Sequence, residues 1–132
     1  MKAGFVYLDT SVALAHLLAE GVEPPDALWD ESLLSSRLLE YEVWTRLQSR
    51  GLGDTHGELA RVLLSGVSML ELVQPVVARA AEAFPLPVRT LDAMHLASLL
   101  FVIDQGQAIQ LASYDARMQA IATALGVHLY PL

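Results

Sequence analysis

Short apolar runs that alternate with helical segments are the feature that most constrains the fold of this chain. Strands of parallel sheets read as nearly continuous apolar runs, because helices cover both faces of such sheets. The sequence therefore predicts an α/β fold, a three-layer α/β/α sandwich with a central, mainly parallel sheet. The expected strands lie within residues 4–9, 32–36, 70–73, 108–113 and 127–130.

Helical segments with recognisable ends separate these runs. Thr10 or Ser11 is expected to cap a first helix that Gly21 closes, and Ser36 is expected to cap a later one. Pro75 suits the first turn of another helix. The expected helices cover residues 10–21, 36–51, 56–70, 76–84, 91–106 and 115–126, with a short helical turn within 23–31.

From length and composition we expect one domain covering residues 1–132, located in the cytoplasm. Apolar residues make up 54% of the chain, which favours a tight core and an apolar surface for a partner. Cysteine is absent, which excludes disulfides and thiolate metal sites. The basic start followed by apolar residues resembles a secretory signal, but Asp9 and His16 interrupt it. The apolar stretch LASLLFVI is shorter than the roughly 20 residues that span a bilayer.

The charge balance limits the classes of function. The formal net charge is −7, whereas a general nucleic-acid binder normally carries a basic face. An enzyme whose acids gather in one metal-filled pocket is compatible with this charge. Lys2 is the one lysine, and the other seven basic residues are arginines, whose guanidinium groups bind phosphate bidentately.

Two acids follow expected strands. Asp9 ends the first apolar run, and Asp115 lies just past the run within 108–113. Either carboxylate suits the N-terminus of the next helix, whose dipole favours an acid. Ligands of parallel α/β folds also bind beyond the carboxyl ends of strands, where both acids would face the same edge of the sheet. Ser113 is placed to orient a carboxylate or a water molecule.

Asp92 lies in the first turn of a helix that is expected to be buried nearly all round. Its neighbours are mostly apolar, and a buried carboxylate needs a partner. Arg89 is the one basic residue within a turn of it. His95 follows one turn later. A base or a metal ligand is one interpretation of it, and we prefer the interpretation as a structural histidine.

The segment LLEYEVW adds two glutamates on one helix. Glu42 has Arg46 four residues later, which is the favoured spacing for a surface ion pair, and Glu40 can pair with Arg37. Helical periodicity does not choose between the two glutamates as site residues. Carboxylates that share a pocket repel one another, and a divalent cation relieves this. An all-oxygen set without cysteine or clustered histidine suits Mg²⁺ or Mn²⁺.

Five segments, YLDTSVAL, SSRLLEYEVW, TLDAMHLASLL, LASYDARM and LGVHLYP, together resemble the PIN-domain nucleases, and more narrowly the VapC toxins of toxin–antitoxin pairs. The resemblance covers almost the whole chain. Glu42, six residues after the helix-opening Ser36, matches the family's helical acid, and Glu40 stays a possible substitute for it. By this resemblance the catalytic residues are Asp9, Glu42, Asp92 and Asp115, with Asp9, Asp92 and Asp115 as metal ligands. The supporting residues are Thr10, Ser11, Ser113 and His95.

The resemblance implies an endoribonuclease dependent on Mg²⁺ (or Mn²⁺), the toxin of a type II toxin–antitoxin system, which hydrolyses RNA phosphodiesters with a metal-activated water. It also implies a VapB-type antitoxin and a homodimer as partners, with no membrane. The candidates for RNA contact are Arg37, Arg46, Arg50 and Arg117. The alternative is a catalytically inactive PIN-like interaction module, in which the acids cap helices and pair with arginines.

Overall fold

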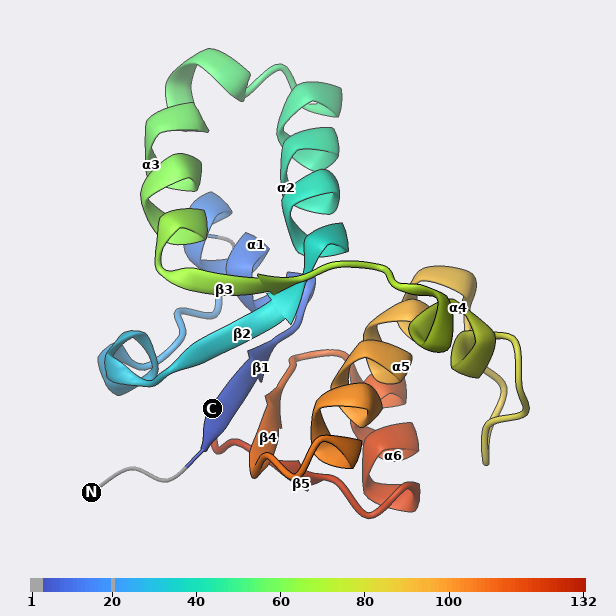
Figure 1. Cartoon of the computed structure of the whole chain (residues 1–132). Helices are drawn as coiled ribbons and strands as arrows, with labels where there is room; N and C mark the ends of the chain where they lie inside the picture. Colours follow the sequence, from blue (N-terminus) through green and yellow to red (C-terminus); the bar gives the residue numbers. More distant parts are fainter. Residues whose placement is uncertain (1–3, 20) are drawn as a thin grey trace.

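The computed structural model describes residues 4–19 and 21–132, and in this part of the chain five strands pack between helices (Figure 1). The strands are β1 (Phe5–Leu8), β2 (Leu33–Ser36), β3 (Val67–Leu70), β4 (Ile109–Ala112) and β5 (His128–Leu129). The helices are α1 (Thr10–Leu18), the 3₁₀ helix η1 (Asp26–Asp30), α2 (Arg37–Ser49), α3 (Gly53–Ser65), α4 (Gln74–Ala80), α5 (Thr90–Asp104) and α6 (Ala116–Ala124).

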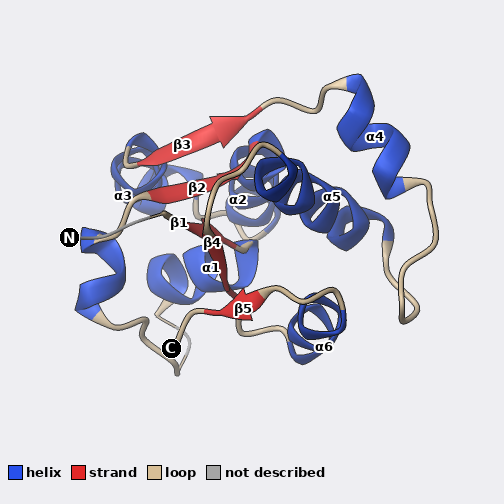
Figure 2. Cartoon of the chain, turned by 60° about the horizontal axis from the view of Figure 1, so that its bottom comes forward, coloured by secondary structure: helices blue, strands red, loops and turns tan. Residues whose placement is uncertain are grey.

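The strands form one sheet in the order β3-β2-β1-β4-β5, which Figure 2 shows from β3 to β5. Every neighbouring pair is parallel. At the centre of the sheet, Tyr7 of β1 lies opposite Leu34 of β2 and Leu111 of β4. The predicted α/β fold with a parallel central sheet is therefore confirmed, and the carboxyl ends of β1 and β4 lie side by side.

Helices cover both faces of this sheet. Val6 and Leu8 of β1 are buried on the face that α1, α2 and α3 cover. Tyr7 points to the other face, where it packs with Leu96 of α5 and Met118 of α6. The alternation of side chains along a strand thus sends consecutive residues of β1 into two different cores. No helix in the described part of the chain is long and apolar enough to cross a membrane.

The ends of α1 differ from the prediction. Asp9, and not Thr10 or Ser11, holds the N-cap position, and it makes no side-chain hydrogen bond to the helix. The helix ends at Leu18, and Ala19 adopts the left-handed conformation with φ 51°, so Gly21 does not close it. The carboxylate of Asp9 instead accepts hydrogen bonds from the hydroxyl groups of Ser11 and Ser113, both at Oδ2.

The predicted helix over 56–70 and strand over 70–73 are wrong in their boundaries. Gly66 directly follows α3, and β3 runs over Val67–Leu70 beside Leu33–Ser36 of β2. Glycine and the β-branched Val67 are poor helix formers, and pairing with β2 supplies the hydrogen bonds that a longer helix would have given. α4 also ends at Ala80, earlier than expected.

Candidate active site

A cleft of about 770 Å³ opens at the carboxyl edge of the sheet. Side chains from α1, α2, α5 and the loop between β4 and α6 line it. The apolar wall is formed by Leu14, Ala15, Leu18, Val22 and Leu91. The polar lining is formed by Asp9, Thr10, Ser11, Glu42, Arg46, Arg89, Thr90, Asp92, Tyr114 and Asp115. The four acids predicted for the site thus come from four separate segments and share this cleft.

Asp9 is buried, with 5% of its surface exposed, and two hydroxyl groups hold its carboxylate. Ser11 Oγ and Ser113 Oγ donate to Asp9 Oδ2 over 2.6 and 2.8 Å. The backbone N–H groups of Tyr114 and Asp115 donate in turn to these two serines, each over 3.0 Å. This network joins the ends of β1 and β4 and fixes the orientation of the Asp9 carboxylate.

Asp115 uses its two oxygens in different ways. Oδ1 accepts from the backbone N–H groups of Arg117 and Met118 over 2.9 and 3.1 Å, so it caps α6. Oδ2 accepts from Arg89 over 2.7 Å. The expected capping role of Asp115 is therefore present, and the oxygen that does not cap α6 is held by Arg89.

Arg89 links two of the predicted metal ligands. Its Nε donates to Asp92 Oδ2 over 3.0 Å while its Nη2 reaches Asp115. Burial raises the pKa of Asp92, the guanidinium of Arg89 opposes this rise, and the charges of Asp115 and Asp9 add to it. The sequence placed Arg89 one turn from Asp92 but gave no reason to expect the second bond.

Glu42, and not Glu40, lines the cleft. Its Oε1 accepts from Thr10 Oγ1 over 2.9 Å and lies 2.5 Å from His95 Nε2. The alternative ion pair with Arg46 is absent from the described structure. Glu40 instead pairs with Arg37, with 3.0 Å between Oε2 and Nη1, as one interpretation of the sequence expected.

His95 is a buried structural histidine, with 2% of its surface exposed. Its Nδ1 lies 2.8 Å from the hydroxyl of Tyr7, which is fully buried on β1. Sequence reasoning missed Tyr7 as a residue of the site. The available signal was a tyrosine within an aliphatic strand, because a buried phenol needs a hydrogen-bond partner.

The four arginines predicted to contact RNA lie in different surroundings. Arg46 lines the cleft and makes no ion pair with any described residue. Arg37 is held by Glu71 over 2.6 Å, and neither Arg50 nor Arg117 lines the cleft. Besides Arg46, the basic residue that does line it is Arg89.

The donor chemistry of the cleft fits a divalent cation. The carboxylates of Asp9, Asp92 and Asp115 are the oxygen ligands that Mg²⁺ and Mn²⁺ prefer. Within residues 4–19 and 21–132, however, no three acidic or histidine side chains stand close enough together to hold an ion. Arg89 lies between Asp92 and Asp115, so cation binding would require this side chain to withdraw.

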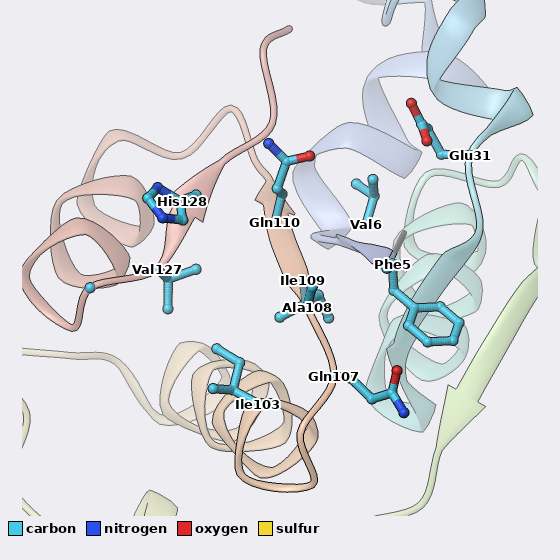
Figure 3. Close-up of a pocket in the computed structure, with 12 residues that line it drawn as sticks. Phe5, Val6, Glu31, Ile103, Gln107, Ala108, Ile109, Gln110, Val127 and His128 are labelled. Carbon is cyan, nitrogen blue, oxygen red and sulfur yellow. The ribbon is translucent and has the colours of Figure 1, made fainter. Parts of the chain in front are cut away.

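A second hollow of about 480 Å³ lies at the opposite edge of the sheet (Figure 3). Phe5, Ile109 and Val127 lie along it, at the start of β1, at the start of β4 and just before β5. Glu31 is the acid among the described residues that line it. This hollow lacks the gathered carboxylates that distinguish the cleft at the carboxyl edge.

The model of the PIN domain family matches residues 6–124. This chain belongs to the PIN domain family. It is 29% identical to Ribonuclease VapC47 of Mycobacterium tuberculosis over an alignment of 120 residues that covers 86% of each chain. A solved structure, a toxin–antitoxin complex from Klebsiella pneumoniae, has the same fold with a TM-score of 0.60 at 16% identity, covering 87% of this chain and 90% of that one. The resemblance inferred from the sequence is thereby confirmed.

Proposed function

We propose that this PIN-domain protein is a Mg²⁺-dependent endoribonuclease. The observation that carries the proposal is the meeting of Asp9, Glu42, Asp92 and Asp115 in one cleft at the carboxyl edge of the sheet. The similarity to a relative named as a ribonuclease supports the same activity. Asp9, Asp92 and Asp115 would hold the cation.

Each residue of the cleft then has a definable task. A bound divalent cation lowers the pKa of water and offsets the charge that develops on the phosphate oxygens. Glu42 orients the attacking water and accepts its proton. Ser11 and Ser113 fix the carboxylate of Asp9. Arg46 is available to bind phosphate because no acid of the described chain holds it.

The biological role that we propose is that of the toxin in a type II toxin–antitoxin pair in the cytoplasm, inhibited by a VapB-type antitoxin. The structural neighbour described as a toxin–antitoxin complex supports this role. Exposed apolar side chains offer surface for an antitoxin and for a second copy of the chain. They include Leu59 and Val62 on α3 and Leu72, Val73 and Val77 around the start of α4. An adjacent open reading frame for a small DNA-binding protein is the expected genetic context.

RNA cleavage with and without Mg²⁺ tests the proposal. The parent protein is expected to cut single-stranded RNA in Mg²⁺ and to stop when EDTA is added, whereas Asp9→Asn does not cut in either buffer. Glu58→Gln is a matched control, because it also removes one acidic charge and Glu58 is exposed on α3. Cleavage by Asp9→Asn at the parent rate, or cleavage that EDTA leaves unchanged, would contradict the assignment.

The inactive interaction module remains a second candidate because one observation favours it. Asp115 caps α6, and both Asp92 and Asp115 pair with Arg89, as expected for acids with purely structural roles. Asp9 and Glu42 follow neither pattern. A calorimetric titration with Mn²⁺ separates the candidates: saturable binding that Asp9→Asn removes supports the nuclease, and no binding supports the module.

A further inference from the structure

Three side chains from three elements form a continuous hydrogen-bonded chain behind the cleft. The hydroxyl of Tyr7 on β1 lies 2.8 Å from Nδ1 of His95 on α5. Nε2 of the same imidazole lies 2.5 Å from Oε1 of Glu42 on α2. Tyr7 and His95 are buried, while the Glu42 side chain is 20% exposed at the cleft. The chain therefore runs from the core to the proposed site.

The chemistry of the three groups gives the chain a direction. Tyr7 is fully buried, and its phenol carries one O–H that can donate to the imidazole nitrogen 2.8 Å away. A carboxylate can only accept, so Nε2 must carry a proton that it donates to Glu42. When the phenol donates to Nδ1, the imidazole accepts at Nδ1 and donates from Nε2, which is the pattern of the Nε2–H tautomer.

The same contacts leave one oxygen of Glu42 for the cleft. Oε1 accepts from both His95 and Thr10. Oε2 has no hydrogen-bond partner among residues 4–19 and 21–132. Rotation of the Glu42 side chain would break both bonds to Oε1, so the buried imidazole selects the orientation in which Oε2 is free for a water molecule or a substrate.

We propose that Tyr7 is a positioning residue for Glu42: its hydroxyl donates to Nδ1 of His95 and thereby holds the Nε2–H tautomer that orients the glutamate. This inference rests on the proposed nuclease function for its catalytic consequence. The tautomer itself does not depend on RNA cleavage. A purely structural Tyr7 would contribute packing, which phenylalanine supplies equally well.

The first test reads the imidazole directly. Nitrogen-15 NMR of the labelled protein, with the His95 signals assigned from their absence in His95→Gln, is expected to show an acceptor-type Nδ1 and a protonated Nε2. In Tyr7→Phe the two nitrogen shifts move toward each other, because Nδ1 has lost its donor and other protonation states become populated. A protonated Nδ1 in the parent, or unchanged shifts in Tyr7→Phe, would overturn the proposal.

The second test separates positioning from folding. Tyr7→Phe is expected to lower kcat for RNA cleavage about tenfold to a hundredfold, the usual loss when a supporting hydrogen bond is removed, with KM little changed. His95→Gln retains one acceptor and one donor and is expected to retain more kcat than His95→Leu. Tyr130→Phe is the matched control. The Tyr130 hydroxyl donates to Glu31 over 3.3 Å, and neither residue lines the cleft.

The outcomes distinguish this inference from the proposed function. If the parent does not cleave RNA, the nuclease assignment fails, while the nitrogen shifts still decide the tautomer. If the parent cleaves and folded Tyr7→Phe has the parent kcat, the positioning role is wrong and the nuclease stands. Should Tyr7→Phe fail to fold, the parent spectrum and the order of kcat for His95→Gln and His95→Leu still decide the matter.

Discussion

Arg89 donates to Asp115 across the edge of the cleft, with 2.7 Å between Nη2 and Oδ2, although the two residues are 26 positions apart. Its Nε also reaches Asp92. One guanidinium thus neutralises two of the three carboxylates that we assign to a cation. In the absence of a cation this arrangement limits the repulsion between the acids, and it also places Arg89 in competition with the metal.

Arg89→Gln is therefore expected to bind Mn²⁺ more tightly than the parent, by roughly fivefold, since exposed ion pairs are individually weak. Isothermal titration calorimetry without RNA measures this directly. Arg61→Gln removes the same charge from the exposed surface of α3 and is the control. Equal or weaker Mn²⁺ binding by Arg89→Gln would show that the guanidinium does not compete with the cation.

Asp92→Asn tests the cost of holding a charge at this position. Because the folded pKa of Asp92 is raised, the folded parent holds this proton more tightly than the unfolded chain does. The contribution of Asp92 to the stability of the parent therefore falls as the pH rises from the ordinary aspartate pKa of about 3.9 to the raised pKa. Above the raised pKa this contribution no longer changes. Asparagine does not titrate, so Asp92→Asn is expected to match the parent at low pH and to have a modestly higher Tm at pH 7.

The measurement is thermal unfolding in EDTA from about pH 3 upward, so that the series begins below the ordinary aspartate pKa of about 3.9. The same variant is expected to lose RNA cleavage in Mg²⁺. A lower Tm at neutral pH would mean that the Asp92–Arg89 pair stabilises the fold more than burial of the charge opposes it. Stability gained with loss of activity is the usual signature of a site that stores unfavourable charge.

The sequence predicted those parts of the fold that local patterns determine. β1 and β4 lie within the mostly apolar runs that predicted them, and Ser36 caps α2 as expected, accepting from Leu38 N over 3.1 Å. β3 was misplaced because Val67–Leu70 becomes a strand by pairing with β2, a contact that no local pattern contains. Local propensity predicted a helix that continued through Gly66 to Leu70, and tertiary pairing with β2 decided otherwise.

The site divides in the same way. Asp9 and Asp115 were found because strand ends mark the edge where parallel sheets bind ligands. The contacts of the site were not predictable, because Tyr7 and His95 are 88 residues apart and His95 and Glu42 are 53 apart. Periodicity left Glu40 and Glu42 equivalent, and only the family resemblance favoured Glu42. In the structure, the contacts of Glu42 with Thr10 and His95 place it in the cleft.

Asp115 allows capping to be separated from chemistry. Asp115→Asn retains a side-chain oxygen for the N–H groups of Arg117 and Met118, whereas Asp115→Ala removes the cap. We expect Asp115→Ala to lose about 1 kcal/mol of unfolding free energy and Asp115→Asn to lose much less. Both variants are expected to lose RNA cleavage. Chemical denaturation measures the first effect, and full activity of Asp115→Asn would remove Asp115 from the proposed ligands.

Arg46 is the arginine that we expect to contact RNA, since it lines the cleft beside Glu42 and no acid of the described chain neutralises it. Arg46→Gln should raise the Kd for single-stranded RNA and reduce the slope of log K against log salt by about 0.7, the value for one lost phosphate contact. Binding is measured by fluorescence anisotropy in EDTA, so that no RNA is cut. Arg37→Gln is the matched control because Glu71 and Glu40 already hold Arg37. An equal loss of affinity in both variants would indicate that general charge, and not the cleft, governs binding.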